Sequence, residues 1–210
     1  MKKYEFTGET KVLENGVKVQ RIRTTSIGFV GGWIEKEDNL SHEGTCFVYD
    51  EAVVYGNARV LGDAKILGNG KVFDSAKIYG RAFVYDNAEV FGNAEVYNDA
   101  EVFGNAKVSD YAEVYHFAKV YDYARVYDYA EVYDDAEVYD DAEVFGNAKV
   151  YHFAKVFNNA EVFGNAKVFN NVKVYDYAEV FGNAEVYNDV EISGNTEVTD
   201  GTYNNIDIPN

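Results

Sequence analysis

Three histidines are the side chains of this sequence that can exchange protons near neutral pH. His116 and His152 occur in the same phrase, VYHFAKV, with Asp134 midway between them, whereas His42 lies in a separate N-terminal segment. A His–Asp–His set can bind a metal ion or orient a general base. Which of these roles is open depends on the elements that position the three side chains.

Carboxylates are the second chemical group that recurs at fixed spacing. The chain has 36 acidic and 19 basic residues, and its net charge is -17. Residues 1–45 contain seven acids and seven bases, so the whole excess lies beyond them. This distribution lacks the basic stripe that phosphate binding needs, and argues against direct binding of nucleic acid. A basic partner, cations or simple solubility remain as explanations.

Several classes of site are missing from the sequence. There is no Ser-His-Asp set, Gly-rich phosphate loop, zinc-type cysteine pair or EF-hand spacing. The single Cys46 excludes an intramolecular disulfide. There is no apolar stretch of about 18 residues and no charged-then-apolar leader, which predicts a cytoplasmic protein without a membrane segment.

A six-residue repeat positions most of the chain. From Cys46 to Gly201 the sequence divides into 26 hexads without an insertion, and AEVFGN at residues 88–93 is typical. Slot one is Ala in 21 hexads, slot three is Val or Ile, and slot two is usually charged. Slot four is Tyr or Phe in 21 hexads, and slots five and six draw mainly on Gly, Asn, Asp and a few aromatics.

This pattern predicts a short strand and a turn in each hexad. Slots one and three share one strand face, and Gly, Asn and Asp suit the turn. A helix is excluded because a six-residue period drifts around a 3.6-residue helix. Three hexads closing a coil stack residue i on residue i+18 at about 4.8 Å. We therefore expect an Ala and Val core, external aromatic ladders at slot four, and about eight and two-thirds coils from the 26 hexads.

Runs such as GNAEVYNDAEVFGNAKV resemble the hexapeptide repeats of trimeric acyltransferases related to UDP-N-acetylglucosamine acyltransferase, although those enzymes prefer Gly at slot four. The chain is more similar to the YdcK-like group, which shares runs of the GNAxVYGNAxV kind and a lead-in resembling GGWIEKEDNLSHEG at residues 31–44. The resemblance implies an all-β, single-stranded, left-handed parallel β-helix, a triangular solenoid. The left hand comes from the resemblance alone, since parallel crossovers are generally right-handed.

Three regions are expected: an N-terminal β-hairpin cap at residues 1–45, the β-helix at 46–201 and a C-terminal cap at 202–210. Residues 3–7 and the two halves of 9–24 have strand patterns, and Asn15-Gly16 predicts a hairpin turn with two positive φ values. The hexad register ends at Thr202, and TYNNIDIPN, with the single proline at Pro209, is expected to close the last coil.

Stacking in steps of three hexads arranges the slot-two charges into columns. One face alternates in sign, and the next carries four acids in register: Glu143, Glu161, Glu179 and Glu197. Such a column repels itself, so it requires either screening by water and salt or a positively charged partner. Both explanations are open.

The turns add further acids and aromatic rings. The acids are Asp110, Asp122, Asp128, Asp134, Asp135, Asp140 and Asp141, and the rings at slot six are Tyr111, Phe117, Tyr123, Tyr129, Phe153 and Tyr177. Rings exposed beside carboxylates make a partner-binding surface. Rings that lie along the turn would instead extend the slot-four ladders.

The leading functional hypothesis is a non-enzymatic binding or scaffold protein without a cofactor. Its acidic, aromatic surface would bind a basic protein or a second copy of the chain, and a sharper version is mimicry of nucleic acid. The resemblance implies the alternative, a trimeric acyltransferase that uses acetyl-coenzyme A, with His116 or His152 as general base. No insertion supplies the loops that cover substrate in such enzymes. No metal site is predicted, because the two histidines stand roughly 10 Å apart.

Overall fold

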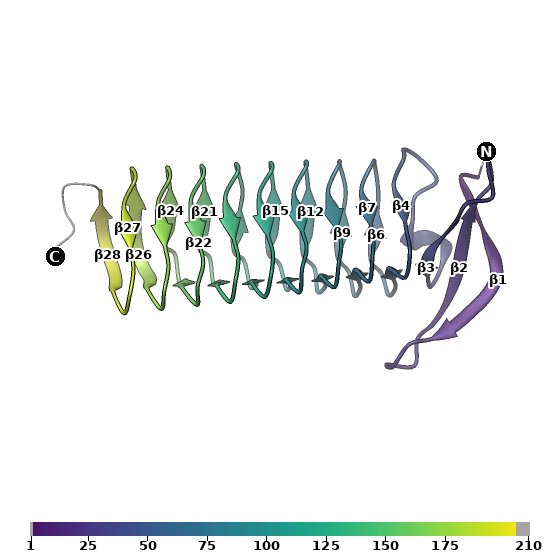
Figure 1. Cartoon of the computed structure of the whole chain (residues 1–210), viewed down its shortest axis with the longest axis horizontal. Coiled ribbons are helices and arrows are strands. Elements are labelled where there is room, and N and C mark those ends of the chain that lie inside the picture. Colours follow the sequence, from purple (N-terminus) through teal and green to yellow (C-terminus); the bar gives the residue numbers. More distant parts are fainter. Residues whose placement is uncertain (1, 205–210) are drawn as a thin grey trace.

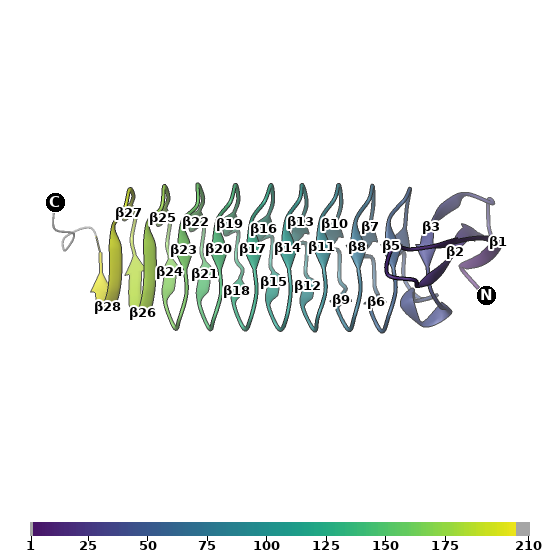
Figure 2. The ribbon, with the colours of Figure 1, turned by 90° about the horizontal axis from the view of Figure 1, so that it is seen from below.

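The computed structural model describes residues 2–204 as a parallel β-solenoid of about 10 turns with an antiparallel β1–β3 cap at its N-terminal end. The coils line up along one axis into a rod, with β1–β3 at one end and β28 at the other (Figures 1 and 2). Within the described residues the only helical segment is one 3₁₀-helix, η1 (Glu37–Asn39). The prediction of an all-β parallel β-helix is confirmed.

Each coil contributes one short strand to each of three faces, which we call A, B and C in chain order. Face A is a nine-stranded parallel sheet. Its strands are β4 (Phe47–Val48), β7 (Lys65–Ile66), β10 (Phe83–Val84), β13 (Glu101–Val102), β16 (Lys119–Val120), β19 (Glu137–Val138), β22 (Lys155–Val156), β25 (Lys173–Val174) and β27 (Glu191–Ile192).

Faces B and C are also parallel, and the long terminal strands β26 (Glu179–Tyr187) and β28 (Glu197–Tyr203) run from B into C. The other strands of face B are β5 (Val53–Val54), β8 (Lys71–Val72), β11 (Glu89–Val90), β14 (Lys107–Val108), β17 (Arg125–Val126), β20 (Glu143–Val144) and β23 (Glu161–Val162). Those of face C are β6 (Arg59–Val60), β9 (Lys77–Ile78), β12 (Glu95–Tyr97), β15 (Glu113–Tyr115), β18 (Glu131–Val132), β21 (Lys149–Tyr151) and β24 (Lys167–Phe169).

The core is built from slots one and three. The alanines and the valines or isoleucines of these slots are fully buried along almost the whole rod. Strand pairing follows the predicted step of three hexads, as in Val90 with Val108 and Val102 with Val120. Burying only small and β-branched side chains keeps the coil narrow, so the larger aromatic residues must lie outside.

The slot-four rings form three external ladders, as predicted. The longest, on face C, runs from Tyr79 to Tyr187 with ring centroids 4.7–5.2 Å apart and nearly parallel planes. Face A carries an unbroken ladder from Tyr85 to Tyr175. Each stacked pair contributes roughly 0.5–1.5 kcal/mol beyond its buried area. The ladders therefore reinforce the same direction as the backbone hydrogen bonds.

Slot five sets the turn chemistry. All 26 slot-five residues, from Asp50 to Asp200, have positive φ. Only Gly, Asp, Asn and His occupy this slot, and these are the residues that adopt the left-handed region with least strain. His116 and His152, with φ of 50° each, thus satisfy a backbone requirement in addition to any chemical role.

The N-terminal region departs from the sequence prediction in two ways. The two strands expected before the hairpin are one strand, β1 (Tyr4–Val12), with a bulge near Gly8 in its pairing with β2 (Lys18–Thr24). At the turn only Gly16 has positive φ, so the predicted pair of positive values is wrong. The backbone hydrogen bond between Leu13 and Val17 closes a longer loop, whose geometry needs one left-handed residue rather than two.

Parallel stacking starts before the first hexad. β3 (Val30–Ile34) pairs antiparallel with β2 on one side and parallel with β5 on the other, and Leu40 bridges Val60. The partners in this first coil are further apart along the chain than three hexads, as in Trp33 with Val53. This additional coil explains why the solenoid has about 10 turns.

The C-terminal register changes at Gly201, which pairs with Ala184 instead of Asn183, the position that the three-hexad step predicts. β28 continues to Tyr203, whose ring packs against the core. The rest of the predicted C-terminal cap, residues 205–210 with Pro209, lies outside the described residues.

Candidate partner-binding surface

The four glutamates predicted to form a column do so on face B. Glu143 pairs in parallel register with Glu161, Glu161 with Glu179, and Glu179 with Glu197. Successive carboxylates are therefore one strand spacing apart, about 4.8 Å at the backbone. At this separation like charges destabilise the pairing unless other groups compensate them.

Most slot-two glutamates elsewhere on the rod are compensated by a tyrosine of the ladder. A slot-four tyrosine donates its hydroxyl hydrogen to the slot-two glutamate that lies on the same face of the next coil. Within residues 2–204, five such bonds of 2.7–3.1 Å lie outside the face B column: Tyr79 to Glu95, Tyr85 to Glu101, Tyr97 to Glu113, Tyr115 to Glu131 and Tyr121 to Glu137. A sixth, from Tyr127 to Glu143, lies at the start of that column. Slot-two lysines and arginines add ion pairs, as between Lys155 and Glu137 at 3.2 Å.

The last three of the four glutamates in the face B column lack this compensation. The slot-four residues of the preceding coils are Phe145, Phe163 and Phe181, which stack but have no hydroxyl group. Within residues 2–204, Glu161, Glu179 and Glu197 make no side-chain hydrogen bond or ion pair. Glu143 differs, because it accepts from Tyr127 at 2.8 Å and pairs with Arg125 at 3.3 Å. The uncompensated set, which we call the glutamate column, is Glu161, Glu179 and Glu197.

The glutamate column has an electrostatic cost that can be measured. Burial, followed by repulsion from Glu179 and Glu143, raises the pKa of Glu161. An acid with a raised pKa binds its proton more tightly in the folded chain, so ionised Glu161 destabilises the fold at neutral pH. This cost disappears as the pH falls below the ordinary pKa value of 4.5.

We therefore expect Glu161→Gln to raise the free energy of unfolding at pH 7 by a few tenths to about 1 kcal/mol, with the gain disappearing in acid. Thermal melts at several pH values measure it. The matched control is Glu113→Gln, which replaces a carboxylate that accepts the Tyr97 hydroxyl hydrogen at 2.7 Å. This change should not stabilise the fold. A Glu161→Gln gain that is independent of pH would contradict the electrostatic origin.

The remaining predicted binding residues lie on three separate corners rather than on one patch. The corner between faces A and B carries Asp122, Tyr123, Asp140 and Asp141; the corner between B and C carries Asp128 and Tyr129; the corner between C and A carries Phe117, Asp134, Asp135 and Phe153. A partner that lies flat on one face can reach that face and its two edges. The glutamate column is bordered by the first two corners.

Some corner acids already have structural partners. The Asp128 carboxylate accepts the Gly146 backbone N–H at 3.2 Å. Asp122 and Asp140 are stacked, and burial together with the Asp122 and Asp141 charges raises the pKa of Asp140. The stacked pair of Asp122 and Asp140 therefore adds negative charge along the edge of face B.

The slot-six aromatics are exposed. Tyr111, Phe117, Tyr123, Tyr129, Phe153 and Tyr177 have 53–64% of their surface accessible. Only Tyr111 and Tyr129 stack on each other, at 5.0 Å, so these rings mostly do not extend the ladders. Phe117 and Phe153 also have positive φ, 63° and 62°, which is strained for a bulky side chain. No pattern in the sequence indicates this strain.

The two corner histidines flank Asp134 as the three-hexad step predicts. His116 Nδ1 lies 3.1 Å from one Asp134 oxygen and His152 Nε2 lies 3.2 Å from the other. Both imidazoles are about half exposed. Across residues 2–204, no group of three or more His, Cys, Asp and Glu side chains is arranged to hold a metal ion. The set is a ladder of side-chain contacts on a solvated corner, with a hydrogen bond between His116 and Asp134.

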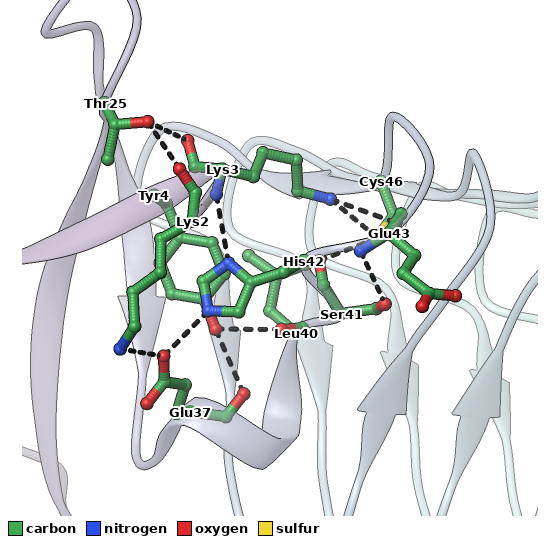
Figure 3. Close-up of polar contacts among 10 residues, drawn as sticks. All are labelled: Lys2, Lys3, Tyr4, Thr25, Glu37, Leu40, Ser41, His42, Glu43 and Cys46. Carbon is green, nitrogen blue, oxygen red and sulfur yellow. Dashed lines mark hydrogen bonds and ion pairs between the residues drawn. The ribbon is translucent and has the colours of Figure 1, made fainter.

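His42 lies in a dense polar network at the N-terminal end (Figure 3). Its Nδ1 accepts the Lys3 backbone N–H at 3.1 Å, so Nε2 carries the hydrogen and donates to Glu37 Oε1 at 2.7 Å. The ring stacks on Tyr4 at 4.3 Å, and the Tyr4 hydroxyl donates to the Leu40 carbonyl at 2.8 Å. Both nitrogens are engaged, so His42 connects β1 to the first coil.

Comparisons with known proteins add no family assignment. No protein-family model matches the chain, and no curated protein matches it. Within the described residues, no helix is long and apolar enough to cross a membrane. The fold defines the protein as a parallel β-solenoid with exposed aromatic ladders.

Proposed function

We propose that the protein is a non-enzymatic binding protein whose glutamate column receives a basic segment of a partner protein. The observation that carries this proposal is the absence, within residues 2–204, of polar partners for Glu161, Glu179 and Glu197, when the other slot-two glutamates of the coils are compensated. Retaining three repelling charges costs stability, and a bound cationic partner would recover that cost.

The phenylalanines of the same coils fit this role. Phe163 and Phe181 form an apolar strip next to the carboxylates, with centroids 4.9 Å apart. A lysine or arginine can lay its alkyl stem on such a strip while its charged end reaches a carboxylate. Replacing a tyrosine of the ladder with phenylalanine thus preserves stacking and frees the glutamate.

The test is binding of a fluorescent oligo-lysine peptide, followed by anisotropy at low and moderate salt. We expect wild-type binding that weakens with salt, because exposed charges are screened beyond a Debye length of about 10 Å at 0.1 M. The triple variant Glu161→Gln, Glu179→Gln, Glu197→Gln should lose at least about tenfold in affinity, a change of about 1.4 kcal/mol.

Face C supplies a matched control. Glu95, Glu113 and Glu131 form a second column in register, each bonded to a ladder tyrosine. Their triple change to Gln removes the same charge from a compensated site and should weaken binding far less. Equal losses from the two variants would show that only bulk charge matters and would reject the proposal.

Several finer assignments belong to the same proposal. We propose left-handed coiling of the YdcK-like kind, a cytoplasmic location, and a partner that is a basic protein or a second copy, with mimicry of nucleic acid as one form of the interaction. The alternative of an acetyl-coenzyme A-dependent acyltransferase rests on His116 and His152. It requires coenzyme binding that calorimetry detects and turnover that His116→Ala or His152→Ala abolishes.

A further inference from the structure

The ladder on face B has one missing ring. Tyr55, Phe73 and Phe91 stack at 5.1 and 4.9 Å, and the stack resumes at Tyr127, Phe145, Phe163 and Phe181. Slot four between these two stacks is Ser109. Where the neighbouring coils place an aromatic ring, this coil has only the hydroxymethyl side chain of Ser109.

The backbone continues through this position without a break. Val108 pairs with Val90 on one side and with Val126 on the other, and the Ser109 N–H donates to the Val126 carbonyl at 3.0 Å. Two rung steps therefore separate the Phe91 and Tyr127 rings by roughly 10 Å. That spacing accepts one further planar ring in stacking contact with both neighbours.

The missing rung opens into a hollow of about 590 Å³ that Phe91, Ser109 and Tyr127 line. Ser109 is almost buried, and its hydroxyl donates to the Asp110 carboxylate at 2.9 Å. The hollow lies within the size range of small-molecule sites. Its floor is polar and its two walls are aromatic.

Two cations lie beside the hollow on the same face. Lys107 and Arg125 are adjacent in register at slot two and also line it. Lys107 reaches Glu89 at 3.3 Å and Arg125 reaches Glu143 at 3.3 Å, yet both side chains are more than half exposed. Asp110 and Asp141 line the hollow from the two corners. An anionic group is therefore favoured at the slot-two side and a hydrogen-bond donor at the corner side.

We propose that this missing rung is a binding site for a small planar aromatic anion, such as an aromatic carboxylic acid. Its ring stacks between Phe91 and Tyr127, and its acidic group lies against Lys107 and Arg125. The site is separate from the glutamate column and does not depend on that column binding a basic partner.

The probe is 2-naphthoate, followed by saturation-transfer NMR and by its own fluorescence, with 2-naphthamide as the neutral isostere and cyclohexanecarboxylate as the non-aromatic anion. We expect saturable binding of 2-naphthoate at one site, several-fold weaker binding of the amide, and none of the cyclohexane acid. No saturable binding of 2-naphthoate up to its solubility limit would overturn the proposal.

Filling the rung supplies the decisive variant. Ser109→Phe restores the ladder and should weaken the affinity for 2-naphthoate by at least about tenfold. The melting temperature should stay equal or rise, because the new ring stacks on both sides. The matched control is Ser193→Phe, another slot-four serine, which extends the end of the face A ladder beyond Tyr175 and should bind as wild type does. Unchanged binding by Ser109→Phe places the ligand elsewhere and overturns the site.

The cations are tested separately. Lys107→Gln with Arg125→Gln should reduce 2-naphthoate binding to the level of the amide and leave amide binding unchanged. Equal loss of both ligands would contradict recognition of the acidic group. An aromatic side chain of a second copy is the competing occupant; self-association that Ser109→Phe abolishes and 2-naphthoate does not inhibit would replace the small-molecule assignment.

Discussion

Gly164→Val is expected to lower the free energy of unfolding by roughly 1–3 kcal/mol, because a β-branched residue is forced into a left-handed backbone conformation. Gly164 occupies slot five with φ of 70°, and an added Cβ would lie 3.1 Å from the Gly182 backbone. Urea unfolding measures the change. Hydrogen exchange at β23 and β26 should show that protection is lost there first, since coils of a solenoid contact only their neighbours.

The control for this prediction is Gly164→Asn. Asn158 and Asn170 already occupy slot five with φ of 52° and 58°, so a Cβ and an amide fit this turn. We expect Gly164→Asn to lie within about 1 kcal/mol of wild type. If valine were tolerated as well as asparagine, the positive φ would not be the reason for the narrow choice of residues at slot five.

Most of the fold could be predicted from the six-residue repeat. The alternation of Ala and Val with charged and aromatic residues predicts which atoms are buried, and the uninterrupted hexads predict pairing between equivalent slots one coil apart. The sequence alone therefore predicts that Glu143 and Glu161 lie side by side, and in the structure they do. A solenoid allows this because each contact is between equivalent positions of neighbouring coils.

What lies outside the repeat was harder to predict. β3 and Leu40 join the parallel stack at a step longer than three hexads, which no period in the N-terminal segment indicates.

Within the repeat, the left-handed conformation of Phe117 and Phe153 was not predicted, because phenylalanine is a poor residue for it. At that corner the equivalent residues Asp99 and Asp135 share the conformation, so the neighbouring coils impose it.

The candidate surface was predicted in outline and sharpened by side-chain contacts. Register alone placed Glu143 with Glu161, Glu179 and Glu197. Only the hydrogen bond from Tyr127 and the ion pair with Arg125 separate Glu143 from the other three. In the sequence, the difference is visible as Tyr or Phe at slot four of the preceding coil. It becomes informative only once the hydrogen bond from a slot-four tyrosine to the slot-two glutamate of the next coil is known.

A steep loss of stability above pH 10 is the second large effect expected, because the ladder tyrosines are held protonated by the fold. Burial raises the pKa of Tyr133 to about 12 and, with the Glu113 and Glu131 carboxylates nearby, also raises the pKa values of Tyr97 and Tyr115. Their ordinary value is 10.0. Above it the unfolded chain loses these protons first, so stability falls progressively from about pH 10 up to the raised values.

Urea unfolding midpoints at pH 8 and pH 11 measure the loss, and the triple variant Tyr97→Phe, Tyr115→Phe, Tyr133→Phe separates its causes. The variant keeps the rings stacked, as Phe169 already does in the same ladder, but removes three titrating hydroxyls. At pH 8 it should be less stable, since Glu113 and Glu131 lose hydrogen bonds worth roughly 1 kcal/mol each. Between pH 8 and 11 it should lose less stability than wild type. Lysine deprotonation also weakens ion pairs in this range, so an identical slope in both proteins would assign the alkaline loss to the lysines and contradict the role of the tyrosines.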